Sequence, residues 1–354
     1  MRQPTSDLRI RTARPLLSPA ILEEDLPLGE AGAALVQRVR REIGDILAGR
    51  DGRLLAVVGP CSIHDPQAAL EYARKLKPVA DRLARDLLVV MRVYFEKPRT
   101  VVGWKGLIND PHLDGSFMVN TGLRIARQLL LDINAAGVPI GTEFLDTTLG
   151  QYYADLVSWA AIGARTTESQ IHRELASGLS MPVGFKNRTD GDLQVAVDAI
   201  VSAGHPHWFP SLTREGAPAV LATTGNNECH LVLRGGSRTG PNFGAEAIGQ
   251  AVELLRKAGA APRVLVDCSH GNSGKQPQRQ AEVAADVARQ VAGGSDAIFG
   301  VMIESNLVAG AQRHESGRPL AYGQSITDAC LGFDETLPLL EQLAAASARR
   351  RTGR

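Results

Sequence analysis

The chain has few cysteines, almost no net charge and no long apolar run, and each absence excludes a class of protein. The four cysteines, at positions 61, 229, 268 and 330, form neither a C-x-x-C pair nor a disulfide framework. Because 39 lysines and arginines balance 38 acidic residues, we expect no nucleic-acid or membrane partner. The N-terminus lacks a signal-peptide core and no run approaches the ~18 apolar residues of a membrane span, so we expect a cytoplasmic protein.

What the sequence does contain is a repeated alternation of short apolar runs and amphipathic stretches. After several of the apolar runs, apolar residues recur at the spacing of a helix. One such helix is expected to begin at Asp65-Pro66, an N-cap residue followed by a first-turn proline. Eight such units with continuously apolar strands predict an α/β fold, a closed (β/α)8 TIM barrel. A doubly wound sheet is the alternative, but no G-x-G-x-x-G motif follows a strand. The expected strands are Leu54–Gly59, Leu87–Tyr94, Pro139–Phe144, Trp159–Gly163, Pro182–Lys186, His230–Arg234, Val264–Asp267 and Ile298–Ile303.

Three segments fall outside this repeat. Residues 1–50 are expected to form an N-terminal arm, with a short strand at Asp7–Thr12, a proline-rich irregular stretch and a helix at Glu30–Leu47. Two further strands, His207–Leu212 and Ala219–Thr224, predict a β-hairpin (205–225) inserted between barrel strands 5 and 6. The catalytic barrel is assigned to residues 51–347, and the basic residues 348–354 to a disordered tail.

Cationic side chains recur at the predicted carboxyl ends of the strands, which meet at one mouth in a barrel. The run V-V-M-R-V-Y-F-E-K-P-R-T (89–100) is typical, because a buried strand carries Arg92 and then ends at Pro98. Arginine forks match phosphate and carboxylate oxygens, so the set favours a doubly anionic substrate or two phosphorylated substrates. Each cation could instead pair with a neighbouring acid. The set is Arg92, Lys97, Arg99, Arg165, Lys186 and Arg234, with Lys105 just beyond.

Metal-binding atoms also gather at the predicted strand ends. Cys61, His270 and Glu304 offer sulfur, nitrogen and oxygen ligands, and Asp328 follows the last strand. Such a set fits one divalent ion of Mn, Fe, Co or Zn. However, a lone buried cysteine is more often core packing, and His270 could act only in proton transfer. Cys330 lies two residues from Asp328, which suggests the hypothesis that it forms a disulfide with Cys61 when metal is absent.

Long segments of the chain closely resemble one enzyme family. G-P-C-S-I-H-D, M-R-V-Y-F-E-K-P-R-T, G-A-R-T-T-E-S-Q, P-V-G-F-K-N, L-R-G-G and S-I-T-D-A-C are together similar to the type I, amino-acid-regulated 3-deoxy-D-arabino-heptulosonate 7-phosphate (DAHP) synthases. The resemblance extends from about Asp7 to Leu343. It implies a barrel transferase that condenses phosphoenolpyruvate with erythrose 4-phosphate and water, giving DAHP and phosphate, at the entry to the shikimate pathway.

The resemblance also implies roles for individual residues. The expected catalytic residues are Lys97, Lys186, His270 and Cys61. Arg99 and Thr100 would hold the phosphate of erythrose 4-phosphate, with Lys97 and Pro98 nearer its hydroxyls. Phosphoenolpyruvate would be bound by Arg92, Arg165, Lys186 and Arg234, with Lys97 and Glu143 nearby, and the metal by Cys61, His270, Glu304 and Asp328.

Regulated members of the family bind an aromatic amino acid away from the barrel mouth. In this chain Ser211 stands where tyrosine-sensitive relatives tend to carry glycine, which favours phenylalanine as the effector. Gly150 replaces a proline common in relatives, a difference that bears on effector affinity. The expected lining is Gln151, Leu175, Leu179, Ser180, Phe209, Ser211 and Leu221, with Asp7 supplied by a neighbouring chain of a homo-oligomer, either a dimer or a tetramer.

Three other functions compete with this interpretation. A sister synthase that uses arabinose 5-phosphate shares the barrel, but it carries a K-A-N-R-type segment where this chain has K-P-R-T. A Schiff-base aldolase would use Lys186 as its nucleophile, which the metal-ligand set disfavours. A non-catalytic metabolite sensor would be expected to lack ligands or cations, and none is missing from this sequence.

Overall fold

The computed structural model describes residues 5–99, 101–315 and 317–353, and within them eight parallel strands close into a barrel. Each strand pairs with the next, and the last returns to the first with Gly59 opposite Glu304. The predicted (β/α)8 barrel is therefore confirmed. Its strands are β1 (Leu54–Gly59), β2 (Leu87–Arg92), β3 (Ile140–Glu143), β4 (Trp159–Ile162), β5 (Val183–Lys186), β8 (Cys229–Leu233), β9 (Val264–Asp267) and β10 (Ile298–Asn306).

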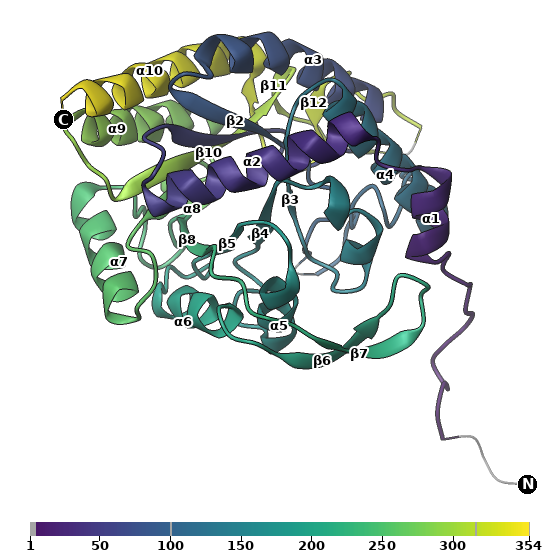
Figure 1. Cartoon of the computed structure of the whole chain (residues 1–354). Helices are drawn as coiled ribbons and strands as arrows, with labels where there is room; N and C mark the ends of the chain where they lie inside the picture. Colours follow the sequence, from purple (N-terminus) through teal and green to yellow (C-terminus); the bar gives the residue numbers. More distant parts are fainter. Residues whose placement is uncertain (1–4, 100, 316, 354) are drawn as a thin grey trace, which may run out of the picture.

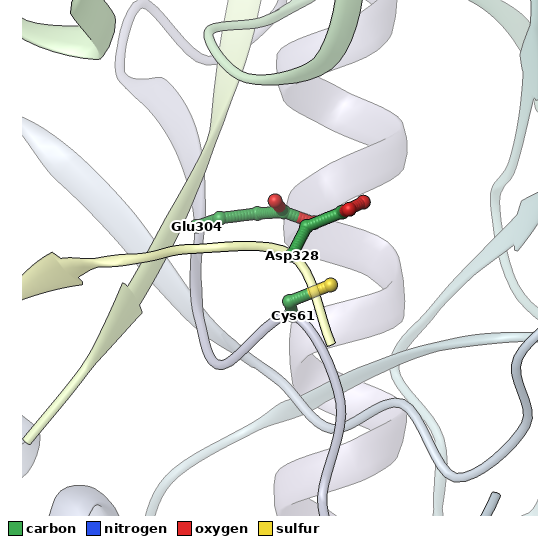
Figure 2. A group of neighbouring side chains, drawn as sticks. All are labelled: Cys61, Glu304 and Asp328. Carbon is green, nitrogen blue, oxygen red and sulfur yellow. The ribbon is translucent and has the colours of Figure 1, made fainter. Parts of the chain in front are cut away.

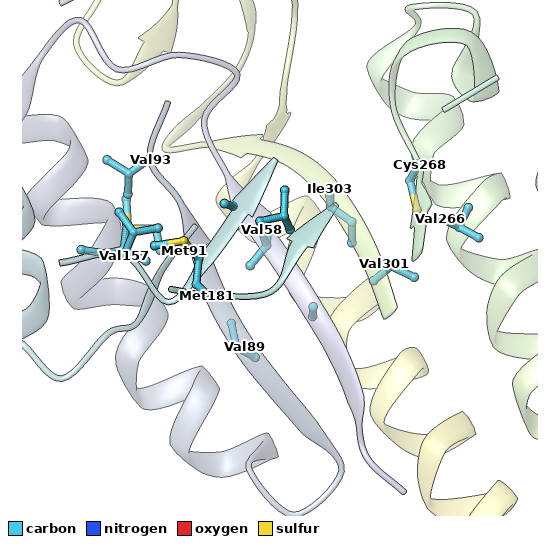
Figure 3. Close-up of a cluster of buried hydrophobic side chains, with 14 of the residues drawn as sticks. Val58, Val89, Met91, Val93, Val157, Met181, Val266, Cys268, Val301 and Ile303 are labelled. Atoms are coloured by element: carbon cyan, nitrogen blue, oxygen red, sulfur yellow. The ribbon is translucent and has the colours of Figure 1, made fainter. Parts of the chain in front are cut away.

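Amphipathic helices surround the strands (Figure 1). Helix α3 begins as the sequence predicted, because the Asp65 carboxylate accepts hydrogen bonds from the amides of Gln67 and Ala68. Helices and strands enclose an apolar layer that includes Val58, Met91 and Val301 (Figure 3). Within the described ranges no helix has the length and apolarity to span a membrane. The helices are α3 (Pro66–Leu83), α4 (Val119–Ala135), α5 (Gln170–Gly178), α6 (Gln194–Ala203), α7 (Ala245–Lys257), α8 (His270–Ser273), α9 (Gln280–Ala292) and α10 (Phe333–Thr352).

The amino end of the barrel is closed by helix α2 (Glu30–Ala48). Its residues Val39 and Ile43 pack with Leu55 and Leu88, which stand near the starts of their strands and point into the barrel. The helix ends at Gly49, whose φ of 77° is the left-handed conformation that glycine adopts readily. Because this end is filled, the carboxyl ends of the strands are left to form a binding site.

The inserted hairpin is confirmed, whereas the arm differs from expectation. Strands β6 (Trp208–Leu212) and β7 (Pro218–Ala222) pair antiparallel between β5 and β8 in the chain. The strand expected at Asp7–Thr12 is wrong, since residues 5–17 contain no strand and the arm extends away from the barrel up to Arg14, where it is hydrogen-bonded to the segment before α4 (Figure 1). A strand needs a partner edge, and a single chain offers this arm none. Helix α1 (Pro19–Asp25), capped by Ser18, forms in the stretch expected to be irregular.

The carboxyl-terminal segment also differs from expectation. Helix α10 continues to Thr352, so the disorder predicted for residues 348–354 is wrong as far as residue 352. The cause is Arg350, which is buried and donates hydrogen bonds to the carbonyls of Ser295, Ile298 and Gly52 at 3.0–3.1 Å. A run of arginines in a sequence does not reveal that one of them satisfies three buried carbonyls.

Candidate active site

A cavity of about 670 Å³ opens at the carboxyl ends of the barrel strands. It gathers side chains from the ends of β2, β3 and β5 and from the loops after β2, β4, β8 and β9, as the barrel geometry predicted. Lys105 is exposed and does not line it, and Thr100 lies outside the described residues. The predicted site residues that line the cavity are Arg92, Lys97, Pro98, Arg99, Glu143, Arg165, Lys186, Arg234, His270 and Asp328.

Arg92, the last residue of β2, is 1% exposed and lies at the centre of the site. Its guanidinium donates to the carbonyls of Pro60 (3.1 Å) and Cys61 (3.2 Å). It also lies 2.9 Å from Glu304 Oε1 and stacks on the ring of Tyr94, 3.6 Å from the ring centroid. One buried cation therefore fixes the loop after β1 relative to the end of β10.

Three of the four predicted metal ligands come together beside Arg92. The ligand atoms of Cys61, Glu304 and Asp328 all lie within 4.8 Å of one another. Figure 2 shows their side chains gathered from the loop after β1, from β10 and from the loop before β13 (Leu331–Gly332). The fourth, His270, is adjacent, with Nε2 3.7 Å from Glu304 Oε1. The barrel thus brings together residues that lie far apart along the chain.

The electrostatics of this cluster fit a bound cation. Burial opposes the ionisation of Glu304, but His270, Arg92 and Lys97 outweigh it and lower its pKa to about 2. Glu304 Oε1 is buried and accepts no hydrogen bond from the described residues, because the nearby guanidinium is poorly aligned with it. Burial and Glu304 raise the pKa of the Cys61 thiol, although Lys97 Nζ lies 3.2 Å from its sulfur. A divalent ion would supply the charge that favours the thiolate.

Cys61 also has a second cysteine, Cys330, as a neighbour. The backbone amide of Cys61 donates to Cys330 Sγ at 3.4 Å, and both thiols are free and buried. Oxidation of this pair in the absence of metal stays a prediction.

The opposite side of the cavity is cationic. Arg165 and Arg234 follow β4 and β8, Lys186 ends β5, and the three side chains face a common space. Burial lowers the pKa of Arg234, and the positive charge of Arg165 acts in the same direction. An anion between these groups would relieve their mutual repulsion, since bidentate pairing to phosphate suits both guanidinium groups.

Several site residues were not assigned roles from the sequence. Lys275 and Arg279 line the cavity from the segment after His270, and Thr189 and Ser237 line it from two other loops. Asp267 lies beneath the cavity and contacts both Lys186 and His270. The motif D-C-S-H-G-N-S-G-K contained a signal for two of these residues, Asp267 and Lys275, because it places them at the end of a barrel strand and in the segment that follows.

A second cavity of about 740 Å³ lies away from the mouth, against the hairpin and α2. One side of it is apolar and includes Leu175, Phe209 and Leu221. The chain's own Asp7 is exposed in the arm. All seven residues of this chain that were predicted to bind an effector line the cavity: Gln151, Leu175, Leu179, Ser180, Phe209, Ser211 and Leu221.

A buried carboxyl group lies between the two cavities. Glu96 Oε2 accepts hydrogen bonds, both 3.4 Å, from the Asp146 amide and the Tyr153 hydroxyl. These two residues flank the short helix η1 (Leu149–Tyr152), which contributes Gln151 to the second cavity. The next residue after Glu96 is Lys97, whose amine touches Cys61. A short chain of contacts thus connects the cavities.

Glu96 should make stability depend on pH. Burial raises its pKa from 4.5 to about 7, with Asp146 and Glu143 acting in the same direction. Its contribution to stability is complete below pH 4.5 and is lost as pH rises to 7, because the folded state then holds a proton that the unfolded state has released. As the pH rises from 5 to 8, we expect the free energy of unfolding of Glu96→Gln to increase by about 2 kcal/mol relative to that of the wild type. Thermal unfolding at each pH measures this difference. The control is Glu282→Gln, at an exposed position, and a gain independent of pH would contradict the prediction.

Comparison with known proteins agrees with this geometry. The model of the DAHP synthetase I family matches residues 27–341. The Phe-sensitive phospho-2-dehydro-3-deoxyheptonate aldolase of Escherichia coli K12 is 58% identical over 351 residues, which cover 99% of this chain and 100% of the relative. A Trp-sensitive relative from Enterobacter agglomerans is 54% identical over 346 residues, covering 98% of this chain and 99% of the relative.

Solved structures give the same result. The phospho-2-dehydro-3-deoxyheptonate aldolase of Francisella tularensis SCHU S4 superimposes with a TM-score of 0.94 at 53% sequence identity. The match covers 97% of this chain and 99% of that one. In sequence and fold, over nearly its whole length, the chain belongs to the DAHP synthetase I family.

Proposed function

We propose that the mouth cavity condenses phosphoenolpyruvate with erythrose 4-phosphate and water to give DAHP and phosphate. The observation that carries this proposal is the convergence, in one cavity, of cations suited to two phosphorylated substrates and a sulfur–oxygen cluster suited to a divalent ion. C3 of phosphoenolpyruvate forms a bond to the aldehyde carbon, water adds at C2, and cleavage of the C2–O bond releases phosphate. Family membership supports the same reaction.

The cationic side chains divide between the two substrates. Arg165, Lys186 and Arg234 surround the space that fits the phosphate of phosphoenolpyruvate, with Arg92 and Lys97 nearer the proposed metal site. Arg99 and Pro98 lie on the outer side of the cavity, where the phosphate and hydroxyls of the aldose would bind with Thr100. Cations held in place before the reaction stabilise the charge that gathers in the transition state.

Cys61, His270, Glu304 and Asp328 would hold one divalent ion of Mn, Fe, Co or Zn. When bound, such an ion supplies Lewis-acid chemistry toward the aldehyde or positions a water. Lys97 keeps its amine against the Cys61 sulfur and carbonyl, so it can orient the ligand and place a positive charge beside the reacting groups. Glu143 is buried in the cavity wall, where a carboxylate can orient a water.

The alternative of a Schiff-base aldolase finds less support. Lys186 Nζ forms a 2.9 Å ion pair with the fully buried Asp267, so its amine is directed at a carboxylate and not at the carbon of a bound carbonyl. Borohydride trapping of Lys186 with either substrate would identify such an aldolase. Parallel assays with arabinose 5-phosphate would identify the sister activity.

The decisive assay measures phosphate release from phosphoenolpyruvate plus erythrose 4-phosphate. We expect activity that a chelator removes and Mn²⁺ restores, and a loss on the order of 10²-fold or more in Cys61→Ala. Cys229→Ala is the matched control, since Cys229 is also buried but starts β8 at the closed end of the barrel. Chelator-resistant turnover, or equal rates for the two variants, would contradict the proposal.

We also propose that the second cavity binds an aromatic amino acid, with phenylalanine favoured. Its apolar side suits an aromatic ring, whereas Gln151, Ser180 and Ser211 offer hydrogen bonds to the polar end of the amino acid. The exposed arm, with Leu8 70% and Ile10 63% exposed, would pack on a neighbouring chain of a homo-oligomer and bring Asp7 to that chain's cavity.

Filling this cavity should remove feedback inhibition. In Ser211→Phe the added ring occupies space that the effector needs, so we expect the phenylalanine concentration for half-inhibition to rise at least ~10-fold. The measurement is the ratio of rates with and without phenylalanine. Val220→Thr is the control, because Val220 lies on the same hairpin but outside the cavity. If phenylalanine inhibits Ser211→Phe as strongly as the wild type, the effector does not bind in this cavity.

A further inference from the structure

We propose that Asp267 is a positioning residue, which holds the metal-binding side chain of His270 and the phosphate-binding side chain of Lys186 with one carboxylate oxygen. Asp267 ends β9 and is fully buried. Its Oδ2 lies 2.9 Å from both Lys186 Nζ and His270 Nδ1. The inference rests on the function proposed above and goes beyond it by naming what aligns the two halves of the site.

The other oxygen of Asp267 fixes the carboxylate itself. Oδ1 accepts hydrogen bonds from the amide (3.0 Å) and the hydroxyl (2.6 Å) of Ser269. The carbonyl of Asp267 accepts a further bond from Asn272 Nδ2 at 2.8 Å. These bonds fix the position of the Asp267 carboxylate. The side chains of Lys186 and His270 are therefore oriented by Asp267, and not the reverse.

The consequence for His270 is a defined tautomer. Its Nδ1 faces Asp267 Oδ2 and the Ser269 hydroxyl, and that hydroxyl already donates to Asp267. The network therefore places a proton on Nδ1 and leaves Nε2, 3.7 Å from Glu304, free to act as a ligand. The backbone of His270 has a φ of 54°, unusual for a side-chain-bearing residue, which these contacts hold in place.

The consequence for Lys186 is a fixed direction across the barrel. Strand β5 is not the neighbour of β9, because β8 lies between them, so the ion pair spans the barrel interior. Lys186 lies in the wall of the mouth cavity, and Met302 Sδ is 3.5 Å from its amine. Asp267 thus connects the anion-binding and metal-binding sides, which otherwise come from separate strands.

The test is Asp267→Asn, measured as Mn²⁺ binding to metal-free protein and as steady-state kinetics. An amide cannot accept from Lys186 and His270 on the side where it carries hydrogens. We expect the Kd for Mn²⁺ to rise ~10- to 100-fold and the KM for phosphoenolpyruvate to rise, with the KM for erythrose 4-phosphate changing little. A purely structural role would instead lower thermal stability and leave the Mn²⁺ Kd unchanged.

The matched control is Cys268→Ala, at the next position of the same strand end. Cys268 is equally buried but points into the apolar layer with Val266 and Val301 (Figure 3). If Asp267→Asn does not fold, the double variant Asp267→Asn/Lys186→Met, which removes the uncompensated lysine charge, is titrated with Mn²⁺ in its place. Wild-type Mn²⁺ affinity in either folded Asp267 variant, or an equal loss in Cys268→Ala, overturns the inference.

The wild-type protein separates this inference from the function on which it rests. If it binds no Mn²⁺, or releases no phosphate from the two substrates, the proposed function fails. If it does both and the Asp267 variants match it, only the role of Asp267 fails.

Discussion

The buried guanidinium of Arg92 fixes the geometry on which the whole mouth of the barrel depends. A charge that is 1% exposed is tolerated only when it is paired, and Arg92 finds its partners in two carbonyls of the loop after β1 and in Glu304 of β10. Removing one partner of such a pair typically costs about 3–5 kcal/mol, because the other charge remains buried. The loop that carries Cys61 and the strand that carries Glu304 are therefore held together before any ligand binds.

Around this pair, charges of opposite sign alternate from one strand end to the next. Lys97 contacts the Cys61 sulfur, Glu304 lies between Arg92 and His270, and Asp267 is shared by His270 and Lys186. Each buried charge is thus stabilised by a neighbour, which keeps the site rigid. Arg165 and Arg234, which face the open cavity, donate their side-chain hydrogen bonds to backbone carbonyls within the described residues, so both cations remain able to bind anions.

The second cavity is connected to this arrangement through Glu96. Its carboxyl group contacts residues on both sides of η1, while the next residue along the chain is Lys97. A movement of η1 would therefore reach the proposed metal ligand Cys61 through two side chains. This gives the proposed effector a physical route to the reaction centre without any contact between effector and substrate.

The sequence predicted the barrel well because buried parallel strands leave a local signal, a short run of apolar and β-branched residues. The site followed from the same signal, since His270 and Glu304 come directly after or within strands that end at one mouth. Other features had no local signal. The burial of Arg350 depends on carbonyls roughly 50 and 300 residues away in the chain, and the arm at Asp7–Thr12 lacks a partner strand in a single chain. The role of Asp267 required knowing that β5 and β9 lie on either side of β8 in the barrel, so that their end residues can meet.

The central claim is that a divalent ion and phosphoenolpyruvate bind side by side at this mouth. Anomalous X-ray scattering at the manganese edge, from crystals grown with Mn²⁺ and phosphoenolpyruvate, tests it most directly. The account predicts one strong peak enclosed by Cys61, His270, Glu304 and Asp328, with the substrate phosphate between Arg165, Lys186 and Arg234. A peak elsewhere on the protein, or a phosphate bound away from those three cations, would contradict it.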